Sequence, residues 1–333
     1  MINNTGILVF GELSGGKLAS ITLELLTIGR KLGDDLKQDL NVLLIGSDSE
    51  SVGQDAINYG ADRVYWIEHP LLENYQTETY KEALLGLYKQ IMPDIVLMGQ
   101  TSIGKDLAPS LAFELDTVAV LDCIALSIDP NARRMEQIKP VYGGNAIATY
   151  VAESGRPQIA TLRPKTVYPS QKDGDRKGEV IKFQIELDPS KIRVHVLGMV
   201  KDEIVGEKLE EANVIICGGR GMGSAEAFAQ LNELSKILHG VVGGTRPACD
   251  AGWLPPYLQI GLTGKLVSPN IYLGVALSGS SQHQAGMAGS KNIIAINKDP
   301  EANIFNIAHY GVVGDYRKIL PSFMEKCKEL VSK

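Results

Sequence analysis

Short apolar runs alternate with helical patterns along most of this chain, and this alternation limits its fold more than any other feature. The first four runs are ILVF (7–10), NVLLIG (41–46), RVYWIE (63–68) and DIVLMG (94–99). Each run has the length of a buried strand. The segments between them place apolar residues on one helical face, as Ile21, Leu25 and Ile28 do after the first run. Repeated strand–helix units predict a largely parallel sheet with right-handed crossovers.

The alternation stops after Val118. Four strand-like runs between residues 118 and 164 follow one another with little helical pattern between them. They predict either an antiparallel extension of the same sheet or a lid. Residues 168–180 are polar, charged and contain two glycines, as is typical of an exposed connection.

The strand–helix pattern returns in the last third of the chain. Strand-like runs lie at 213–217, 240–244, 271–277, 292–296 and 310–314. The last run is followed by a helical pattern in which Pro321 predicts a kink or a break. We therefore expect two α/β domains with a boundary between about 185 and 205. An N-terminal domain with a parallel or mixed sheet would span 1–190, and a doubly wound domain with a C-terminal helix would span 205–333.

Composition restricts the class of function. The 333 residues carry a net charge of −6 with no basic block, so a broad nucleic-acid surface is not expected. The four cysteines are scattered and form no CxxC pair, which argues against zinc and iron–sulfur sites and for reduced thiols in the cytosol. No apolar run nears the ~20 residues of a membrane span, and residues 1–10 lack the pattern of a secretory signal. We therefore expect a cytoplasmic protein without membrane insertion.

Small, polar or charged residues follow all five strand-like runs of the C-terminal part. They are Gly218–Gly221, Thr245–Arg246, Ser278–His283, Asn297–Asp299 and Asp315. Loops at strand ends are polar in any protein, but that rule does not predict glycines interleaved with hydrogen-bonding side chains at every end. In a doubly wound sheet the carboxyl ends of the strands share one edge, where ligands bind. The sequence therefore predicts a bound ligand at this edge.

The stretch GGRGMGS (218–224) is an incomplete dinucleotide fingerprint. Counting from Gly219, the sixth position is Ser224 instead of glycine, and Thr245–Arg246 stands where the fingerprint requires an acid. The stretch LSGSSQHQAG (277–286) is better placed for phosphate. Its glycine-flanked serines lead into a short helical pattern, whose first backbone amides can bind an anion. Beside these serines, His283 is interpreted as a ligand contact.

The long segment GGTRPACDAGWLPPYLQIGLTGK (243–265) shows little regular pattern. Structureless segments of this length in a compact domain are usually functional. This one offers a cation at Arg246, a hydroxyl at Thr263, and glycines at 261 and 264 where a ligand can approach the backbone closely.

Together these motifs resemble the alpha subunit of electron-transfer flavoproteins. The similarity rests on GGRGMGS, GGTRPACDAGW, QIGLTGKLVSPNIYLGVALSGSSQHQAGM and INKDPEANIFNIAHYGVVGD, in this order, and on GKDLAPSLAFEL and KPVYGGNAIATY in the first half. It spans nearly the whole chain. It implies an electron carrier, not a catalytic enzyme, whose N-terminal domain contacts a beta subunit and whose C-terminal domain holds one FAD. Electrons would pass to and from flavoenzymes such as acyl-CoA dehydrogenases.

The resemblance also implies a set of FAD contacts. They are Arg220, Thr245, Arg246, Ile260, Gly261, Leu262, Thr263, Ser278, Gly279, Ser280, Ser281, Gln282, His283, Asn297 and Asp315. Arg246 would lie beside the isoalloxazine ring, Thr263 near its N5 and His283 near its O2. Asn297 and Asp315 would hold the adenosine end. A cation near a flavin stabilises its more negative, reduced form and so raises its reduction potential.

This chain departs from the common pattern of the family at two places. Leu262 stands where glutamine is frequent, and Ser280–Ser281 replaces a frequent Ala-Ile pair. Both lie at the implied flavin, so its potential would differ from that of ordinary members. The departures slightly favour a subunit of an NADH-dependent electron-bifurcating complex, with a second FAD in the beta subunit, over a one-flavin carrier. Two other classes stay open: an NAD(P)-dependent dehydrogenase, for which no acid–base pair is placed, and a purely structural or binding module.

Overall fold

The computed structural model describes residues 5–46, 50–144, 146–194, 196–198 and 208–331. The chain divides into two compact units, of which the first comprises Met1–Val141 with Ile147–Val200 and the second Tyr142–Ala146 with Lys201–Lys333. The predicted boundary between about 185 and 205 includes residues 199–205, which lie outside the described residues. The two units are taken separately below.

The first unit is built on a seven-stranded sheet in which all paired neighbours run parallel, in the order β12-β5-β4-β1-β6-β11-β7. Its strands are β1 (Ile7–Gly11), β4 (Leu40–Ile45), β5 (Arg63–Ile67), β6 (Ile95–Gly99), β7 (Ala119–Cys123), β11 (Gln158–Leu162) and β12 (Glu179–Lys182). Every residue of β1, β4, β6 and β11 is buried. Strands covered on both faces read as continuous apolar runs, which is why the sequence revealed most of them.

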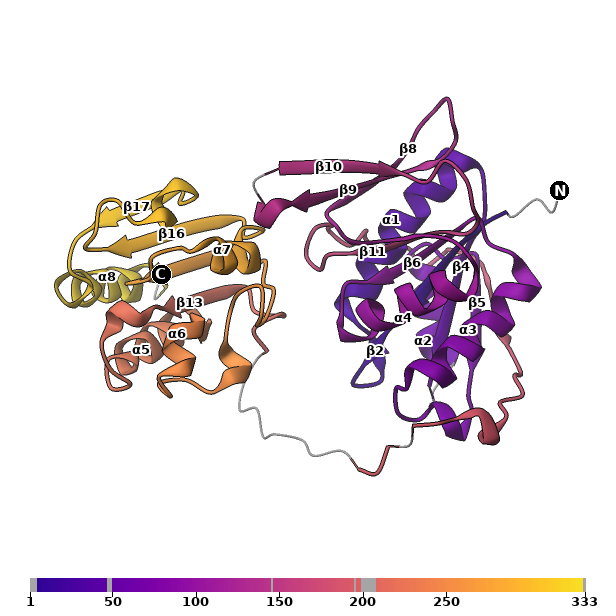
Figure 1. Ribbon diagram of the computed structural model, residues 1–333, viewed down its shortest axis with the longest axis horizontal. Coiled ribbons are helices and arrows are strands. Elements are labelled where there is room, and N and C mark those ends of the chain that lie inside the picture. Colours follow the sequence, from indigo (N-terminus) through magenta and orange to yellow (C-terminus); the bar gives the residue numbers. More distant parts are fainter. Residues whose placement is uncertain (1–4, 47–49, 145, 195, 199–207, 332–333) are drawn as a thin grey trace. The chain divides into compact units, whose positions relative to one another are not determined.

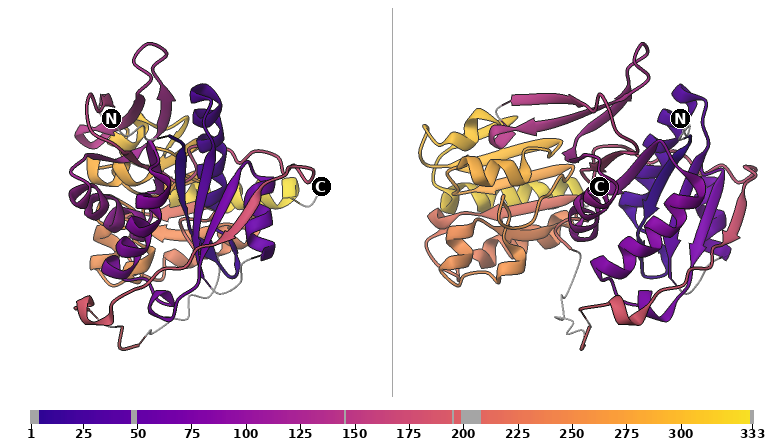
Figure 2. Two further views of the ribbon diagram at one scale, coloured as in Figure 1. Left: turned by 90° about the vertical axis from the view of Figure 1, so that its right-hand side faces the viewer. Right: turned by 45° about the vertical axis from the view of Figure 1, so that its right-hand side comes forward.

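Helices cover both faces of this sheet (Figure 1 and Figure 2). They are α1 (Ser20–Leu36), α2 (Glu50–Asn58), α3 (Thr77–Ile91) and α4 (Ser102–Glu114). Helices α1 and α2 pack on one face in a core around Leu25 and Trp66, and α3 and α4 pack on the other around Phe10 and Leu84. Pro109 lies inside α4, and Gly104 approaches the carbonyl of Gly99 so closely that no larger residue fits there.

The region after residue 118 differs from the expected antiparallel extension of the main sheet. Strands β7 and β11 join that sheet as parallel strands, and β11 lies between β6 and β7. Strands β8 (Ala125–Ile128), β9 (Met135–Val141) and β10 (Ala146–Val151) form a separate three-stranded sheet, in which β8 and β9 pair antiparallel. This small sheet connects β7 to β11 in place of the helix that usually joins parallel strands. The lack of a helical pattern after residue 118 therefore suggested antiparallel strands where the main sheet continues with parallel ones.

The connection at 168–178 is largely exposed, as expected, but it is fastened to the unit at several points. Arg176 donates to Asp62 at 2.8 Å, Lys172 pairs with Asp55 at 2.7 Å, and the amide of Ser170 donates to the hydroxyl of Thr27. Just before it, the carboxylate of Glu24 accepts the amides of residues 165, 166 and 167. Side chains from the helices therefore fix a segment that has little structure of its own.

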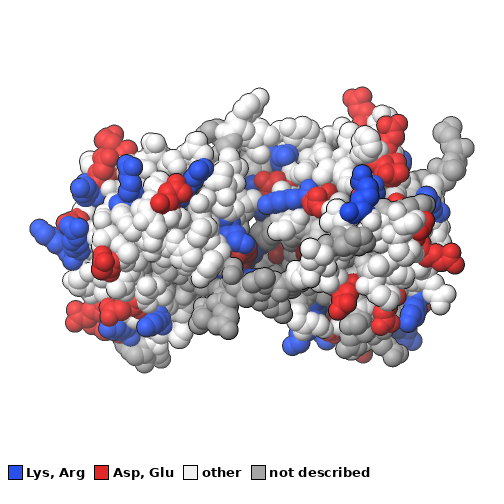
Figure 3. Space-filling view, turned by 60° about the horizontal axis from the view of Figure 1, so that its bottom comes forward, with Lys and Arg blue, Asp and Glu red and all other residues white. Residues whose placement is uncertain are grey.

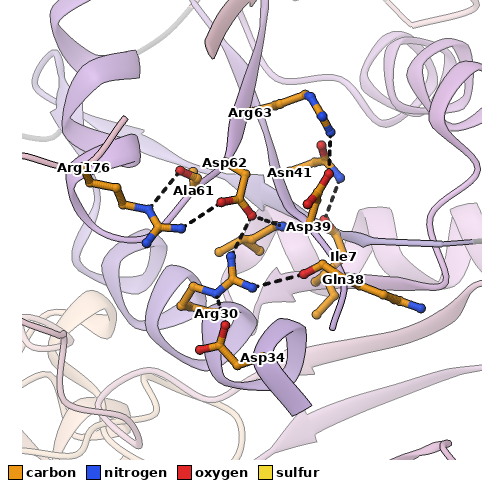
Figure 4. A network of polar contacts seen from close by, with 11 residues as sticks. Ile7, Arg30, Asp34, Gln38, Asp39, Asn41, Ala61, Asp62, Arg63 and Arg176 are labelled. Atoms are coloured by element: carbon orange, nitrogen blue, oxygen red, sulfur yellow. Dashed lines mark hydrogen bonds and ion pairs between the residues drawn. The ribbon is translucent and has the colours of Figure 1, made fainter. Parts of the chain in front are cut away.

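Asp62 is the centre of the polar network in Figure 4. Its carboxylate accepts from the guanidinium of Arg30 at 2.7 Å, from the amide of Leu40 at 2.8 Å and from Arg176 at 2.8 Å. Burial alone would raise the pKa of Asp62, but the Leu40 amide and the two arginines outweigh it and hold the pKa below its ordinary value. The carboxylate thus joins helix α1, the start of β4 and the connection after residue 168.

Replacing Asp62 with asparagine is expected to lower the free energy of unfolding by about 2 kcal/mol, because hydrogen bonds to a charged group that is only partly exposed are lost. Asp39→Asn is the matched control, since Asp39 pairs with Arg63 at 2.7 Å while both side chains are about half exposed. The control substitution should lower the free energy of unfolding by less than about 1 kcal/mol. Urea unfolding of both variants measures the difference, and equal losses would contradict a central role for Asp62.

The second unit contains five parallel strands in the order β14-β13-β15-β16-β17. They are β13 (Val214–Gly218), β14 (Val241–Gly244), β15 (Ile271–Val275), β16 (Asn292–Asn297) and β17 (Tyr310–Val313). All five coincide with predicted runs to within two residues at each end. The chain therefore steps from β13 to β14 and then returns past β13 to β15, which creates a topological switch point between β13 and β15.

Helices α5 (Phe228–Leu238), α6 (Arg246–Asp250), α7 (Ser281–Met287) and α8 (Tyr316–Val331) complete this unit. The helices α5, α6 and α8 share a core around Phe228 and Leu273 on one face, and α7 joins a core around Tyr272 and Met287 on the other. Pro321 lies inside α8, which continues as a single helix to Val331, so the predicted break does not occur.

Charged side chains of both signs are interspersed on the face of the molecule shown in Figure 3, without a continuous basic area in either unit. None of the helices in the described ranges combines the length and the apolar character that crossing a membrane requires.

Candidate functional site

Two glycines bring the ends of β13 and β15 together at the switch point of the second unit. The amide of Gly219 donates to the carbonyl of Val275 at 2.9 Å, and that of Gly221 donates to the carbonyl of Ala276 at 3.0 Å. A Cβ atom at Gly219 would lie 2.3 Å from the Ala276 oxygen and 2.4 Å from the Cα of Leu277. Only glycine fits at such a close approach of two backbones. The GGRG sequence is therefore required by the sheet itself, and it carries Arg220 to the edge.

A hollow of about 400 Å³ lies at this edge. Its lining residues come from all the loops that follow β13, β14, β15 and β16. They are Arg220, Gly221, Thr245, Pro247, Ala276, Leu277, Ser278, Gly279, Ser280, His283, Asn297, Asp299 and Ala302. Arg220 is exposed and has no acidic partner within 4 Å among the described residues. A free cation beside glycine backbone gives the hollow the chemistry of an anion site.

The loop after β15 contributes unpaired backbone amides to the hollow. Gly279 has a φ of +74°, and a Cβ there would lie 2.5 Å from the amide nitrogen of Ile304, so this position also requires glycine. Its carbonyl accepts from the side chain of Gln284 at 2.8 Å, which fixes the loop. Within the described chain the amides of Gly279 and Ser280 have no hydrogen-bond acceptor. They remain available to a bound oxyanion.

A second, smaller hollow of about 110 Å³ continues the edge toward β17. It is lined by Gly221, Ala276, Ile296, Asn297, Lys298, Gly314, Asp315, Tyr316 and Arg317. Asn297 shapes the passage between the two hollows, because its amide group donates to the carbonyl of Leu277 at 2.7 Å. One oxygen of Asp315 accepts from the amide of Arg317 at 3.0 Å and so caps α8. Its other oxygen makes no ion pair or hydrogen bond among the described residues.

The implied set of FAD contacts contains neither cation of this second hollow, although Lys298 belongs to the strand end 297–299 at which the sequence predicts a ligand. Lys298 and Arg317 line it, and neither has an acidic partner within 4 Å among the residues that the structure describes. Lys298 follows a strand-like run, and that signal marks its strand end. Arg317 lies in the first turn of a helix, where the sequence gives no hint. Ala276 was missed as well, since its φ of +52° is rare for a non-glycine residue and invisible in the sequence.

The segment after β14 forms the short helix α6, a 3₁₀ turn (Pro256–Leu258) and a closed turn instead of one unstructured loop. Helix α6 begins at Arg246, whose side chain pairs with Asp250 at 3.4 Å and is largely exposed. Two isolated bridges, Gly244 with Gln259 and Ile260 with Lys265, then close the turn Gln259–Lys265. In that turn the side chain of Gln259 donates to the hydroxyl of Thr263 at 3.0 Å. Arg246 and Thr263 both lie outside the linings of the two hollows.

His283 lies inside the unit and is only 5% exposed. Its Nδ1 lies 3.1 Å from the carbonyl oxygen of Ile260, and its Nε2 lies 2.7 Å from the hydroxyl of Tyr272. Burial lowers the pKa of His283 to about 4. The imidazole therefore lines the hollow as a neutral group whose two nitrogens are already bonded.

The structure brings part of the predicted contact set together. Seven predicted residues line the larger hollow, namely Arg220, Thr245, Ser278, Gly279, Ser280, His283 and Asn297, and Asp315 lines the smaller one. Seven others line neither: Arg246, Ile260, Gly261, Leu262, Thr263, Ser281 and Gln282. Ile260 is a core residue whose amide and carbonyl are both hydrogen-bonded. Leu262 is 62% exposed and donates its amide to the carbonyl of Gln282.

Comparisons with known proteins match parts of both units. Residues 7–188 match the model of the electron transfer flavoprotein domain, and residues 208–288 match that of the electron transfer flavoprotein FAD-binding domain. The alpha subunit of the electron transfer flavoprotein of Thermoanaerobacterium thermosaccharolyticum is 42% identical, over 97% of this chain and 98% of the relative. That of Megasphaera elsdenii is 39% identical, over 97% and 96%. Protein FixB of Clostridium saccharobutylicum is 38% identical, over 98% and 97%.

The match to the FAD-binding domain includes the ends of β13, β14 and β15. Both family models match, and relatives at this level of identity align over nearly their whole length. The chain therefore belongs to the alpha subunits of the electron transfer flavoprotein family, which are flavin-binding electron carriers that work with a beta subunit.

Proposed function

We propose that the flavin of this subunit is FAD and that it binds along the carboxyl edge of the second unit's sheet. The observation that carries this proposal is the pair of adjoining hollows across the switch point, which share Gly221, Ala276 and Asn297. An extended dinucleotide needs such a continuous path with anion-binding groups along it. Arg220 and the amides of Gly279 and Ser280 offer those groups in the larger hollow, and Lys298 and Arg317 in the smaller one.

The residues present fit FAD. Close backbone approaches at Gly219 and Gly279 leave no room for a side chain at these two turns, as a phosphate cradle requires. The carboxylate oxygen of Asp315 that does not cap α8 can accept a hydrogen bond from a ribose hydroxyl at the adenosine end. On this proposal Arg246 and Thr263 face the isoalloxazine ring, and the eight members of the predicted set that line the two hollows hold the rest of the cofactor.

Bound FAD would supply the redox chemistry, and the chain would supply placement and electrostatics. Arg246 adds a positive charge beside the ring. This charge favours the reduced flavin, which is more negative than the oxidised flavin. Thr263 accepts from Gln259, so its own proton is free to point toward a ligand. His283 adds no charge, because its imidazole is neutral above a pH of about 4.

We further propose that the N-terminal domain, residues 1–190, contacts the beta subunit, and that strand β10 takes part. Ile147, Tyr150 and Val151 of this strand are 68%, 43% and 41% exposed, although β10 is an edge strand with apolar side chains. Exposed apolar edges of this kind usually belong to interfaces. Hydrogen exchange at the β10 amides should slow when the heterodimer forms, and unchanged exchange would exclude β10 from the contact.

The electron partners proposed for this subunit are flavoenzymes such as acyl-CoA dehydrogenases. Counting cofactors in the purified heterodimer tests the FAD proposal and separates the two carrier types. One FAD with AMP supports a one-flavin carrier, and two FAD support an NADH-dependent bifurcating complex. A colourless heterodimer, or one holding only a nicotinamide nucleotide, would contradict the proposal and favour a dehydrogenase or a binding module.

Replacing Arg246 with alanine is expected to lower the reduction potential of this flavin, because a positive charge beside the reduced ring is lost. Lys208→Ala is the control. It removes an exposed cation that is paired with Glu211 and lines neither hollow. Redox titration of both heterodimers measures the effect, and equal potentials in the two variants would remove Arg246 from the flavin.

A further inference from the structure

Arg317 reaches from the start of α8 to the glycine turn that follows β13. Its guanidinium carbon lies 5.5 Å from the centre of the Tyr316 ring. A Cβ at Gly223 would lie 3.7 Å from one of its terminal nitrogens, so the side chain extends from the helix back to that turn. The side chain therefore borders the smaller hollow, which Gly221 of the same turn also lines.

Tyr316 joins the two segments between which Arg317 lies. Its ring is buried, and its hydroxyl donates to the carbonyl of Met222 at 2.7 Å. Met222 belongs to the turn after β13 and is itself buried. Because a guanidinium is attracted to the face of an aromatic ring, the Tyr316 ring also favours the observed position of Arg317. The cation therefore has a preferred place at the hollow before any ligand binds.

The guanidinium of Arg317 has no acidic partner in the part of the chain that the structure describes. Arg317 is exposed, and Asp315 accepts from its backbone amide at 3.0 Å and not from its side chain. The helix macrodipole disfavours a cation in the first turn of a helix, so helix stability gives no reason for an arginine at this position. An anionic group of a ligand would supply the missing partner.

The order of the strands decides which part of a bound FAD meets Arg317. Along the sheet edge Arg246 follows β14, Ser278 follows β15 and Arg317 follows β17, in the order β14-β13-β15-β16-β17. At about 4.8 Å between neighbouring strands, the four steps from β14 to β17 cover roughly 19 Å. With the isoalloxazine ring at Arg246, the cofactor reaches Arg317 with its other end. That end is the AMP half of FAD, which FMN lacks.

We propose that Arg317 determines the cofactor specificity of this subunit, because it binds the AMP half and so makes the site select FAD over FMN. The inference rests on the FAD site proposed above, with the ring beside Arg246. The guanidinium offers its N–H donors to the phosphate of the AMP half, while Asp315 accepts from the ribose of the same half. FMN ends at its own phosphate, so it occupies the larger hollow alone and gains nothing from Arg317.

The test is the affinity of the flavin-free heterodimer for FAD and for FMN, each measured by the change in flavin fluorescence on binding. Arg317→Ala is expected to weaken FAD binding about tenfold, the effect of losing one hydrogen bond to a charged group. FMN binding should stay as in wild type, so the preference for FAD falls by the same factor. An equal loss for both flavins, an unchanged FAD affinity, or a wild type without preference for FAD would overturn the inference.

Lys318→Ala is the matched control. Lys318 is the next residue of the same helical turn, is exposed and lines neither hollow, so its loss removes one positive charge without the proposed contact. Both affinities should stay unchanged, and a loss equal to that of Arg317→Ala would overturn the inference by assigning the effect to general charge. A flavin held by the beta subunit is common to all variants, because every substitution lies in this chain.

Arg317→Gln tests the charge at nearly constant side-chain length. It should lose FAD affinity as Arg317→Ala does, and wild-type FAD affinity in this variant would overturn the charged contact. Circular dichroism shows whether each variant is folded. Should Arg317→Ala not fold, Arg317→Gln decides, since it keeps most of the side chain.

The two proposals fail in different ways. A heterodimer that binds neither flavin contradicts the proposed function, and the inference with it. A heterodimer that binds FAD tightly, and whose Arg317→Ala variant keeps the full preference over FMN, contradicts the inference alone.

Discussion

Alanine at position 219 is expected to weaken flavin binding by at least about 100-fold, equivalent to about 3 kcal/mol. The new Cβ would lie 2.3–2.5 Å from three atoms of Ala276 and Leu277. Two of them, the Ala276 oxygen and the Leu277 Cα, belong to the backbone and cannot turn aside. Either β13 or the start of the loop after β15 must move, and Arg220 or the Gly279 amides move with it. Equilibrium dialysis or flavin fluorescence of the heterodimer measures the loss.

Gly174→Ala is the matched control for this substitution. A Cβ at Gly174 meets nothing within 4 Å, so the same methyl group should leave binding and stability unchanged. Circular dichroism shows whether the Gly219→Ala chain keeps its folded content. Flavin affinity within a few-fold of wild type in a folded Gly219→Ala variant would mean that the flavin does not use this turn.

Acidification should destabilise the second unit through His283. The ring is neutral in the folded chain down to a pH of about 4, whereas in the unfolded chain it binds a proton at its ordinary pKa of 6.5. The unfolded state therefore binds more protons between these values, and stability is present above pH 6.5 and lost as the pH falls toward 4. A shift of this size corresponds to about 3 kcal/mol. Wild type should lose about that much more stability than His283→Gln between pH 7 and pH 4.

The difference between the two chains isolates this residue from the carboxylates. Burial raises the pKa of Glu12 and Glu24 in the first unit, and their contributions have the opposite sign. Those contributions are common to wild type and variant and cancel. The chain has two tryptophans, so replacing Trp66 with phenylalanine in both leaves Trp253 as the reporter of the second unit. Parallel stability–pH curves for the two chains would show that His283 is not neutralised by folding.

The strands of the second unit could be predicted from the sequence, because four of the five are largely buried and each apolar run ends at a glycine or is followed by a polar residue. The first unit was predicted less well after residue 118. In the chain the small antiparallel sheet lies between β7 and β11, although these two strands are neighbours in the main sheet. A strand-like run does not show which strand it pairs with. Pairing partners are set by packing across the sheet, which local patterns do not contain.

The loops that form the candidate site could be predicted from the sequence. The burial of His283 and the positions of some charged side chains could not. His283 stands in a polar stretch, yet α7 turns its ring into the core toward Tyr272, eleven positions earlier in the chain. A contact at that separation leaves no local signal. Arg317 reaches the smaller hollow from a helix, and Ala276 adopts a left-handed conformation that only the surrounding hydrogen bonds explain.

The division between a neutral interior and exposed cations has a consequence for how the site responds to salt. Arg220, Arg246, Lys298 and Arg317 all lie on the solvent side, where about 1 M salt shortens the reach of a charge to roughly 3 Å. The glycine turns and the buried Tyr272 and His283 behind them present no exposed charge that dissolved ions could screen. Flavin affinity measured across ionic strength would therefore separate the contribution of charge from that of shape. The affinity that persists at high salt belongs to the backbone and to uncharged side chains.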